Sequence, residues 1–158
     1  MRAADVFDVL DRLDEAGVRH WVGGGWGVAA LVGRLTRAHR DLDLAVQADD
    51  LDRCLDVLAA LGYLPETDWL PVRIEMGAPD DRWVDLHPVK FGQDGYGRQE
   101  GLGGSYFDYP PGAFTSGSIG GRPIPCLSAA QQRQFRTGYE LRSQDLHDLA
   151  ELAALEER

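Results

Sequence analysis

The chain is poor in cysteine, lacks long apolar segments and has fewer basic than acidic residues, and each of these features excludes a class of protein. Two cysteines occur in 158 residues, Cys54 and Cys126, and neither stands in a metal-binding spacing such as C-x-x-C. Two isolated cysteines form no disulfide framework, as expected for a reducing compartment. No apolar run approaches membrane-spanning length, and the first residues contain no apolar segment of a secretion signal. We therefore expect a cytoplasmic protein that does not enter a membrane.

The charge is strongly acidic, with 16 Lys and Arg against 26 Asp and Glu, which gives a formal net charge of −10. An acidic surface repels phosphate backbones, so we expect no nucleic-acid partner. It would attract a small cationic substrate, although acidity also simply favours solubility. Hydrophobic residues make up 44% of the chain. That content and the length predict a single domain over residues 1–158, with a C-terminal helical tail over about residues 128–158.

Hydrophobic periodicity and turn residues predict an order of alternating helices and strands. The expected elements are a helix over 6–13, a strand over 18–22, a helix over 25–31, a strand over 41–46, a helix over 51–61, strands over 72–76, 82–88 and 122–126, a helix after Ser128 and a helix over 143–155. Residues 92–121 are rich in glycine, proline and aromatics, which predicts a partly irregular region that lines a pocket. This order predicts a mixed α/β or α+β domain with a sheet flanked by helices.

A glycine cluster, Gly23-Gly24-Gly25, stands between an apolar strand and a short helix. Glycine leaves no Cβ in the way of a bound group, and the start of a helix presents free N–H groups to phosphates. Three glycines alone are also typical of a plain turn.

Asp41 and Asp43 follow on the next predicted strand. Residues two apart on a strand face the same way, roughly 6–7 Å apart. Two carboxylates placed so repel each other unless a cation lies between them, and Mg²⁺ prefers such ligands together with substrate phosphates. The alternative is an exposed strand with two solvated aspartates.

A third carboxylate, Asp85, alternates with His87 in Trp83-Val84-Asp85-Leu86-His87-Pro88. Asp85 could bind metal, act as a general base, or do both, and His87 could orient it or share the proton transfer. The alternative for His87 is a structural histidine near a strand end.

Basic residues gather just before the first aspartates: Arg34, Arg37, His39 and Arg40. Positive groups beside a phosphate and metal site stabilise charge that develops on a triphosphate. They are equally compatible with ordinary surface charge. Farther on, Arg73 and Glu75 share a strand face and could simply pair with each other.

Several motifs in register give the chain a family resemblance. They are Gly24-Gly25-Trp26-Gly27-Val28, Thr36-Arg37-Ala38-His39-Arg40-Asp41-Leu42-Asp43, Trp69-Leu70-Pro71-Val72-Arg73-Ile74-Glu75, Asp85-Leu86-His87-Pro88, Gly103-Gly104-Ser105-Tyr106, Ile124-Pro125-Cys126-Leu127-Ser128 and Gly138-Tyr139. Together they resemble the short, single-domain lincosamide nucleotidyltransferases, which are related to the aminoglycoside 2″-adenylyltransferases within the polymerase-β-like superfamily. The resemblance runs from about Asp5 to Leu152.

The resemblance implies the polymerase-β-like fold and Mg²⁺-dependent transfer of a nucleoside monophosphate, usually AMP from ATP, to a hydroxyl of an antibiotic, with release of pyrophosphate. By position it implies that Asp41, Asp43 and Asp85 hold the metal and that Asp85 is the general base, with His87 assisting. It implies that Gly24 and Gly25 contact the triphosphate, that Arg37, His39 and Arg40 lie near the phosphates or the catalytic strand, and that Arg73, Glu75 and Tyr106 belong to the acceptor pocket.

Three positions depart from the family pattern, in which acidic or polar residues are frequent: Gly23, Ala29 and Ala45. They put the identity of the acceptor in question and leave the three aspartates intact. A lincosamide is the expected acceptor, because the chain combines acidic loops with many aromatics. The alternatives are an aminoglycoside enzyme, a non-catalytic nucleotide-binding relative and a metal-dependent hydrolase. The sequence leaves open whether two copies associate as a homodimer.

Overall fold

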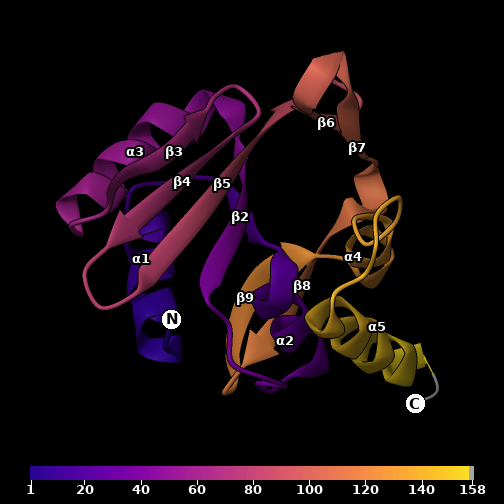
Figure 1. Cartoon of the computed structure of the whole chain (residues 1–158). Helices are drawn as coiled ribbons and strands as arrows, with labels where there is room; N and C mark the ends of the chain where they lie inside the picture. The colour runs from indigo at the N-terminus through magenta and orange to yellow at the C-terminus, as the bar shows by residue number, and fades with distance from the viewer. Residues whose placement is uncertain (157–158) are drawn as a thin grey trace.

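The protein folds as one mixed sheet flanked by helices (Figure 1). The structure is a computed structural model, which describes residues 1–156. The helices are α1 (Ala3–Glu15), α2 (Gly24–Val32), α3 (Leu51–Ala60), α4 (Ala129–Gln134) and α5 (Ser143–Glu156). The strands are β1 (His20–Val22), β2 (Asp41–Gln47), β3 (Leu64–Trp69), β4 (Arg73–Ala78), β5 (Arg82–Phe91), β6 (Gly97–Glu100), β7 (Tyr106–Tyr109), β8 (Phe114–Ile119) and β9 (Arg122–Leu127). The predicted mixed α/β class is therefore confirmed.

The strand order places β2 and β5 at the centre of the sheet. The nine-stranded sheet runs β3-β4-β5-β2-β1-β9-β8, and β6 and β7 extend from the end of β5 as a separate arm. β2 pairs with β5 in parallel and with β1 antiparallel. The register of the parallel pair sets Asp43 opposite Asp85, so two carboxylates that are far apart in the chain become neighbours.

Burial follows the alternation of the central strands. Leu42, Leu44, Val84 and Leu86 are fully buried and pack on one side of the sheet against the apolar faces of α1 and α3. A second, smaller cluster forms on the other side, where Ala45, Tyr109 and Leu127 meet. Because side chains alternate along a strand, the aspartates of β2 and β5 face this second side.

The region 92–121, predicted to be partly irregular, contains the strands β6, β7 and β8 with turns and irregular segments between them. β3 was not predicted at all: it is an edge strand whose residues are mostly exposed, so it shows no apolar alternation. The predicted tail over 128–158 contains α4 and α5 within the described residues, and residues 157 and 158 lie outside them.

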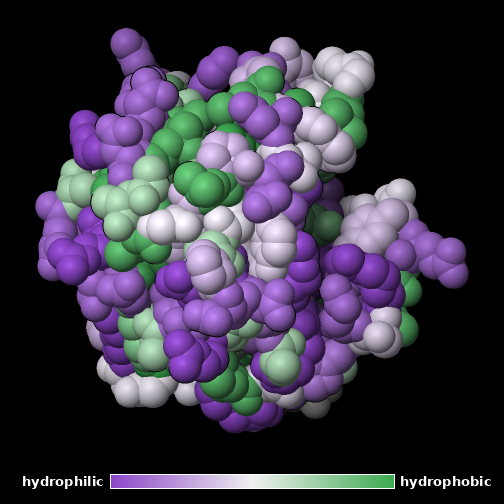
Figure 2. All heavy atoms as spheres, turned by 60° about the vertical axis from the view of Figure 1, so that its left-hand side comes forward, coloured by the Kyte–Doolittle hydropathy of each residue, from purple (hydrophilic) through white to green (hydrophobic). Residues whose placement is uncertain are grey.

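Figure 2 shows one face of the molecule, on which hydrophilic side chains are widespread and apolar ones are set among them. No helix in residues 1–156 combines the length and the apolar character that crossing a membrane requires.

Candidate functional site

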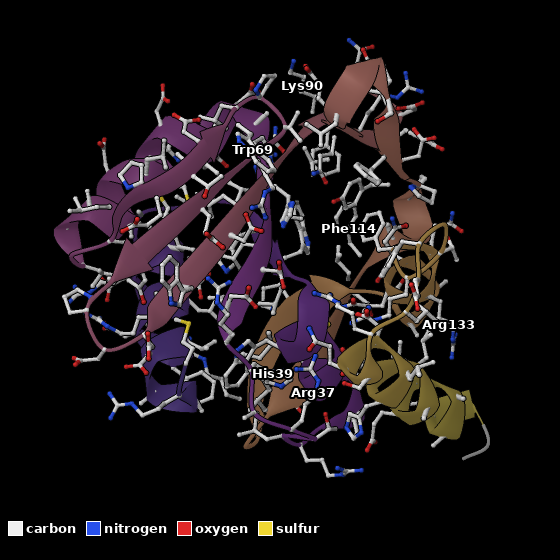
Figure 3. The ribbon with its side chains drawn as sticks, viewed as in Figure 1. Arg37, His39, Trp69, Lys90, Phe114 and Arg133 are labelled. Carbon is white, nitrogen blue, oxygen red and sulfur yellow. The ribbon has the colours of Figure 1, made fainter. Side chains whose placement is uncertain are left out.

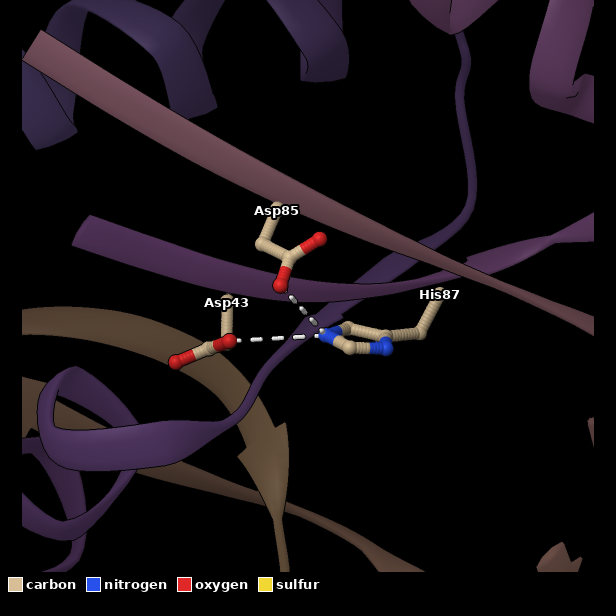
Figure 4. Close-up of side chains that lie close together, drawn as sticks. All are labelled: Asp43, Asp85 and His87. Carbon is tan, nitrogen blue, oxygen red and sulfur yellow. Dashed lines mark hydrogen bonds and ion pairs between the residues drawn. The ribbon is translucent and has the colours of Figure 1, made fainter. Parts of the chain in front are cut away.

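Asp43, Asp85 and His87 form a compact group on the face of the sheet opposite α1 and α3 (Figure 4). One ligand atom from each lies within 4.8 Å of the others. His87 Nε2 is 3.4 Å from Asp43 Oδ1 and 3.7 Å from Asp85 Oδ2. The sequence placed all three residues at a candidate site, and the parallel pairing of β2 with β5 brings them together.

The environment of Asp85 makes its carboxylate costly to ionise. Burial raises the pKa of Asp85 to about 6; the negative charge of Asp43 adds to the effect, while His87 and Arg73 oppose it. Arg73 on β4 forms an ion pair with Asp85 Oδ2, and Asp85 Oδ1 is buried without a hydrogen-bond partner. Burial, followed by the charge of Asp43, also raises the pKa of Asp41. Crowded carboxylates of this kind are typical of functional sites.

This donor set fits a hard divalent cation. Two carboxylates face each other with one unpartnered oxygen, and Mg²⁺ characteristically takes one or two protein carboxylates together with phosphate oxygens. Asp41 stands one step earlier on the same face of β2, outside the group of three, where it is 3.2 Å from Arg40 Nη1.

The start of α2 lies directly against Asp43. Gly24 has a φ of +53°, and a Cβ there would collide with the Asp43 carboxylate. Only glycine therefore lets the backbone of this turn approach the carboxylate so closely. Gly23, the residue before the helix, provides no side-chain cap. The predicted glycine turn thus brings a helix N-terminus next to the aspartates, as a phosphate site requires.

A cavity of about 480 Å³ opens above this group, between the sheet and the arm of β6 and β7. Its polar base contains Asp43, Arg73, His87 and Gln99. Its walls are mainly apolar: Trp69, Val72, Leu102, Phe107, Tyr109, Leu127, Phe135 and Tyr139. Figure 3 shows Trp69 reaching from the end of β3 toward this space. The size and the lining suit a small organic ligand.

The basic residues before Asp41 lie around the site. Among the residues that the structure describes as lining the cavity, Arg34, Arg37, His39 and Arg40 are absent. Arg37 binds Asp148 of α5 through two hydrogen bonds of 2.8 Å, and Figure 3 shows it beside the start of that helix. Arg40 bridges Asp41 and Glu75 at the rim. Arg34 pairs with Glu151.

His39 is buried beneath α2, where it packs on Gly25 and on the Trp26 ring. Neither of its ring nitrogens has a hydrogen-bond partner. Burial, helped by the positive charge of Arg37, lowers the pKa of His39 from 6.5 to about 4. The folded protein therefore keeps this imidazole neutral at pH values where the unfolded chain takes up a proton.

We expect the His39 side chain to make folding sensitive to acid. As the pH falls from 6.5 toward 4, the unfolded state binds a proton that the folded state does not, so stability is lost, by about 2 kcal/mol at pH 5. Urea unfolding of the wild type and of His39→Gln at pH 7, 6 and 5 checks this. The gap between the two proteins should change steadily in favour of the variant on acidification, and parallel pH dependences would contradict the prediction.

Among the residues predicted for the acceptor pocket, Arg73 lines the cavity, whereas Glu75 binds Arg40 at its rim. Tyr106 is 56% exposed and lines a separate groove on the outside of β7. Its neighbour Phe107 lines the cavity and also borders that groove, whereas Tyr106 is absent from the lining of the cavity.

Sequence reasoning missed the residues that complete the cavity from distant segments, namely Gln99, Phe135, Gln132, Arg136 and Arg142. Gln99 Nε2 is 3.3 Å from His87 Nδ1, and its Oε1 accepts a hydrogen bond from Tyr109. No local pattern marks these positions, because their partners come from other elements. The one local signal for a wall of the cavity was the apolar alternation of Phe107 and Tyr109.

Comparisons with known proteins show which family the sequence matches. The sequence pattern of the family described as aminoglycoside-2″-adenylyltransferase matches residues 5–152. A lincosamide resistance protein of Staphylococcus haemolyticus is 31% identical over 96% of this chain and 94% of its own. A 2″-aminoglycoside nucleotidyltransferase of Escherichia coli is 31% identical over 78% of this chain and 66% of its own.

Solved structures show the same fold. The crystal structure of the lincosamide antibiotic adenylyltransferase LnuA with lincomycin bound superposes with a TM-score of 0.89, at 30% identity and 98% coverage of both chains. The complex of ANT(2″)-Ia with adenylyl-2″-tobramycin superposes with a TM-score of 0.75, at 20% identity over 96% of this chain and 87% of the other. The second match supports the fold alone.

Proposed function

Because the chain belongs to the aminoglycoside-2″-adenylyltransferase family, we propose that it transfers a nucleoside monophosphate, AMP from ATP, to a hydroxyl of a small antibiotic. The observation that carries the proposal is the juxtaposition of Asp43, Asp85 and His87 with an uncapped helix start at the base of a cavity. A carboxylate group beside free N–H donors is suited to a metal-bound triphosphate, and the cavity leaves room for the acceptor.

Each residue has a role in the proposed reaction. Asp85 is the general base that accepts the proton of the acceptor hydroxyl. The acceptor oxygen bonds to the α-phosphorus, the bond from that phosphorus to the bridging oxygen breaks, and pyrophosphate leaves with that oxygen. Asp43 and Asp85, with Asp41 beside them, would hold Mg²⁺, which would supply charge that neutralises the phosphates. His87 stays oriented by Gln99 and is hydrogen-bonded to Asp43.

The cavity favours a lincosamide over a polycationic aminoglycoside. Aromatic and aliphatic side chains form most of its walls, which suits a ligand with an apolar part. Asp145, a carboxylate on the far wall, already binds Arg142 at 3.0 Å. Few free carboxylates are therefore left for several ammonium groups. The lincosamide names of two similar proteins point the same way.

The acceptor wall gives a direct prediction. Phe107→Ala should raise the KM for the acceptor about tenfold or more with little change in the KM for ATP, because an aromatic contact with the ligand is lost. Tyr106→Ala is the matched control, since this neighbour faces the outer groove. Steady-state kinetics against both substrates distinguishes them. A large effect of Tyr106→Ala and none of Phe107→Ala would contradict the proposal, because the acceptor would then bind in the outer groove and not in the cavity.

Release of pyrophosphate tests the reaction class. With Mg²⁺ and ATP, release should require the acceptor and cease when it is left out. Release of inorganic phosphate without an acceptor would favour a hydrolase, and ATP binding without any release would favour a non-catalytic relative.

The remaining features belong to the same proposal. Residues 1–158 act as one domain in the cytoplasm, and the helices after residue 128 close one wall of the cavity. Neither nucleic acid nor a membrane is a partner. A homodimer stays a prediction that light scattering checks.

A further inference from the structure

Gln132 on α4 is a buried amide with an unused donor. The residue is 1% exposed and lines the cavity, yet its Nε2 has no hydrogen-bond partner. The orientation of the amide is fixed by Arg136, whose Nη1 donates to Gln132 Oε1 at 2.9 Å. Arginine has no acceptor, so the oxygen must face it and the NH₂ group must point away. That group lies over Gly27, in the first turn of α2.

Arg136 adds positive charge at the same place. It is 8% exposed, lines the cavity and leaves its Nε without a partner. Its Nη2 is 2.7 Å from Asp148, a carboxylate that Arg37 also binds. Two guanidinium groups thus share one buried carboxylate, so a positive charge remains uncompensated in this cluster. The excess is unexpected in a chain with a formal net charge of −10.

The N-terminus of α2 contributes further donors to this wall. The first helical bond joins Gly27 N to Gly23 O, so the N–H groups of Gly24, Gly25 and Trp26 have no partner within the helix. Gly23 offers no cap. Gly24, Gln132 and Arg136 all line the cavity, so backbone and side-chain donors border the same space. Such a set calls for an anion with several acceptor oxygens.

We propose that Gln132 and Arg136 of α4, together with the start of α2, form the subsite that holds the leaving pyrophosphate of the nucleotide. The proposal rests on the proposed function for the identity of the anion and assigns two residues, from a segment about a hundred positions after the glycine turn, to its binding. The last torsion of a glutamine is soft, so a small rotation brings the Gln132 amide onto a phosphate oxygen. Asp148 holds Arg136 in place for this contact.

Titration of inorganic pyrophosphate into the whole protein, with Mg²⁺ present and Mg²⁺ alone as the baseline, tests the subsite without requiring turnover. Gln132→Leu should weaken binding about tenfold, because a hydrogen bond to a charged group is lost. Gln132→Glu should weaken it further, since it replaces the donor with a negative charge while keeping an acceptor for Arg136. Thermal unfolding of Gln132→Leu checks that the fold is kept: the variant loses the side-chain acceptor of Arg136 Nη1, which still donates to the backbone oxygen of residue 132.

Gln131→Glu is the matched control. Gln131 is also buried, but its Nε2 donates to Asp108 O on the side of the outer groove, so the same change of charge there should leave pyrophosphate affinity within about threefold. Equal affinities of the wild type and both Gln132 variants would overturn the subsite, as would no binding of pyrophosphate by the wild type. Product formation by the wild type is measured separately. If the wild type transfers a nucleotide but the Gln132 variants bind pyrophosphate as well as it does, only this inference is wrong. If the Gln132 variants bind pyrophosphate more weakly as expected but the wild type transfers no nucleotide, only the proposed function is wrong.

Discussion

Asp43→Asn is expected to lower the rate of nucleotidyl transfer by about three orders of magnitude or more while leaving the fold intact. Asp43 faces Asp85 across the parallel β2–β5 pair, lies 3.4 Å from His87 Nε2 and lines the cavity. An amide in its place keeps the shape but loses the negative charge that a divalent cation requires. Removal of one of several crowded carboxylates also relieves repulsion between them. The unfolding temperature of the variant should therefore equal or exceed that of the wild type.

Pyrophosphate release and thermal unfolding, each with and without Mg²⁺, measure this pair of effects. The wild type should be stabilised by Mg²⁺ and the variant should not. Asp108→Asn is the matched control, because Asp108 forms an exposed ion pair with Arg98 on the β6–β7 arm. Near-normal turnover of Asp43→Asn would show that the metal assignment is wrong.

Asp148→Asn is expected to cause the largest loss of stability, about 3–5 kcal/mol of unfolding free energy. The carboxylate is fully buried and binds Arg37 and Arg136, whose charges lower its pKa despite the cost of burial. Without it, the buried Arg136 and the partly buried Arg37 lose the carboxylate that both of them bind. The network joins α5 to the segment before β2, so the loss should loosen the wall of the cavity.

Urea unfolding at neutral pH measures the effect. Glu151→Gln serves as the control, because Glu151 stands one turn later on α5 and pairs with the exposed Arg34. An exposed pair contributes about 0–1 kcal/mol. A loss for Asp148→Asn no greater than that of the control would mean that the buried network does not stabilise the fold.

The sequence predicted those parts of the site that local patterns encode. Alternation placed Asp41 and Asp43 on one face of β2 and Asp85 and His87 on one face of β5, and the glycines before α2 marked a close approach of the backbone. Burial on one face explains why the central strands could be recognised, whereas the exposed edge strand β3 could not. The mixed sheet followed from the order of these elements.

Residues that act through distant partners could not be predicted in this way. Gln99 lies on the β6–β7 arm, and its contact with His87 depends on how that arm folds over the sheet. Gln132 and Arg136 matter because α4 packs beside α2. Arg37, predicted near the phosphates or the catalytic strand, donates two hydrogen bonds of 2.8 Å to Asp148 of α5. Tertiary packing, rather than local spacing, decides these roles.

The mass of the acceptor after incubation with ATP and Mg²⁺ tests the account most directly. Lincosamides and aminoglycosides are offered in parallel to the wild type and to Asp43→Asn, and each acceptor is analysed by mass spectrometry. The account predicts a lincosamide heavier by one adenylyl group, formed by the wild type alone. Unmodified acceptors throughout, or an equal yield of adduct from Asp43→Asn, would contradict it.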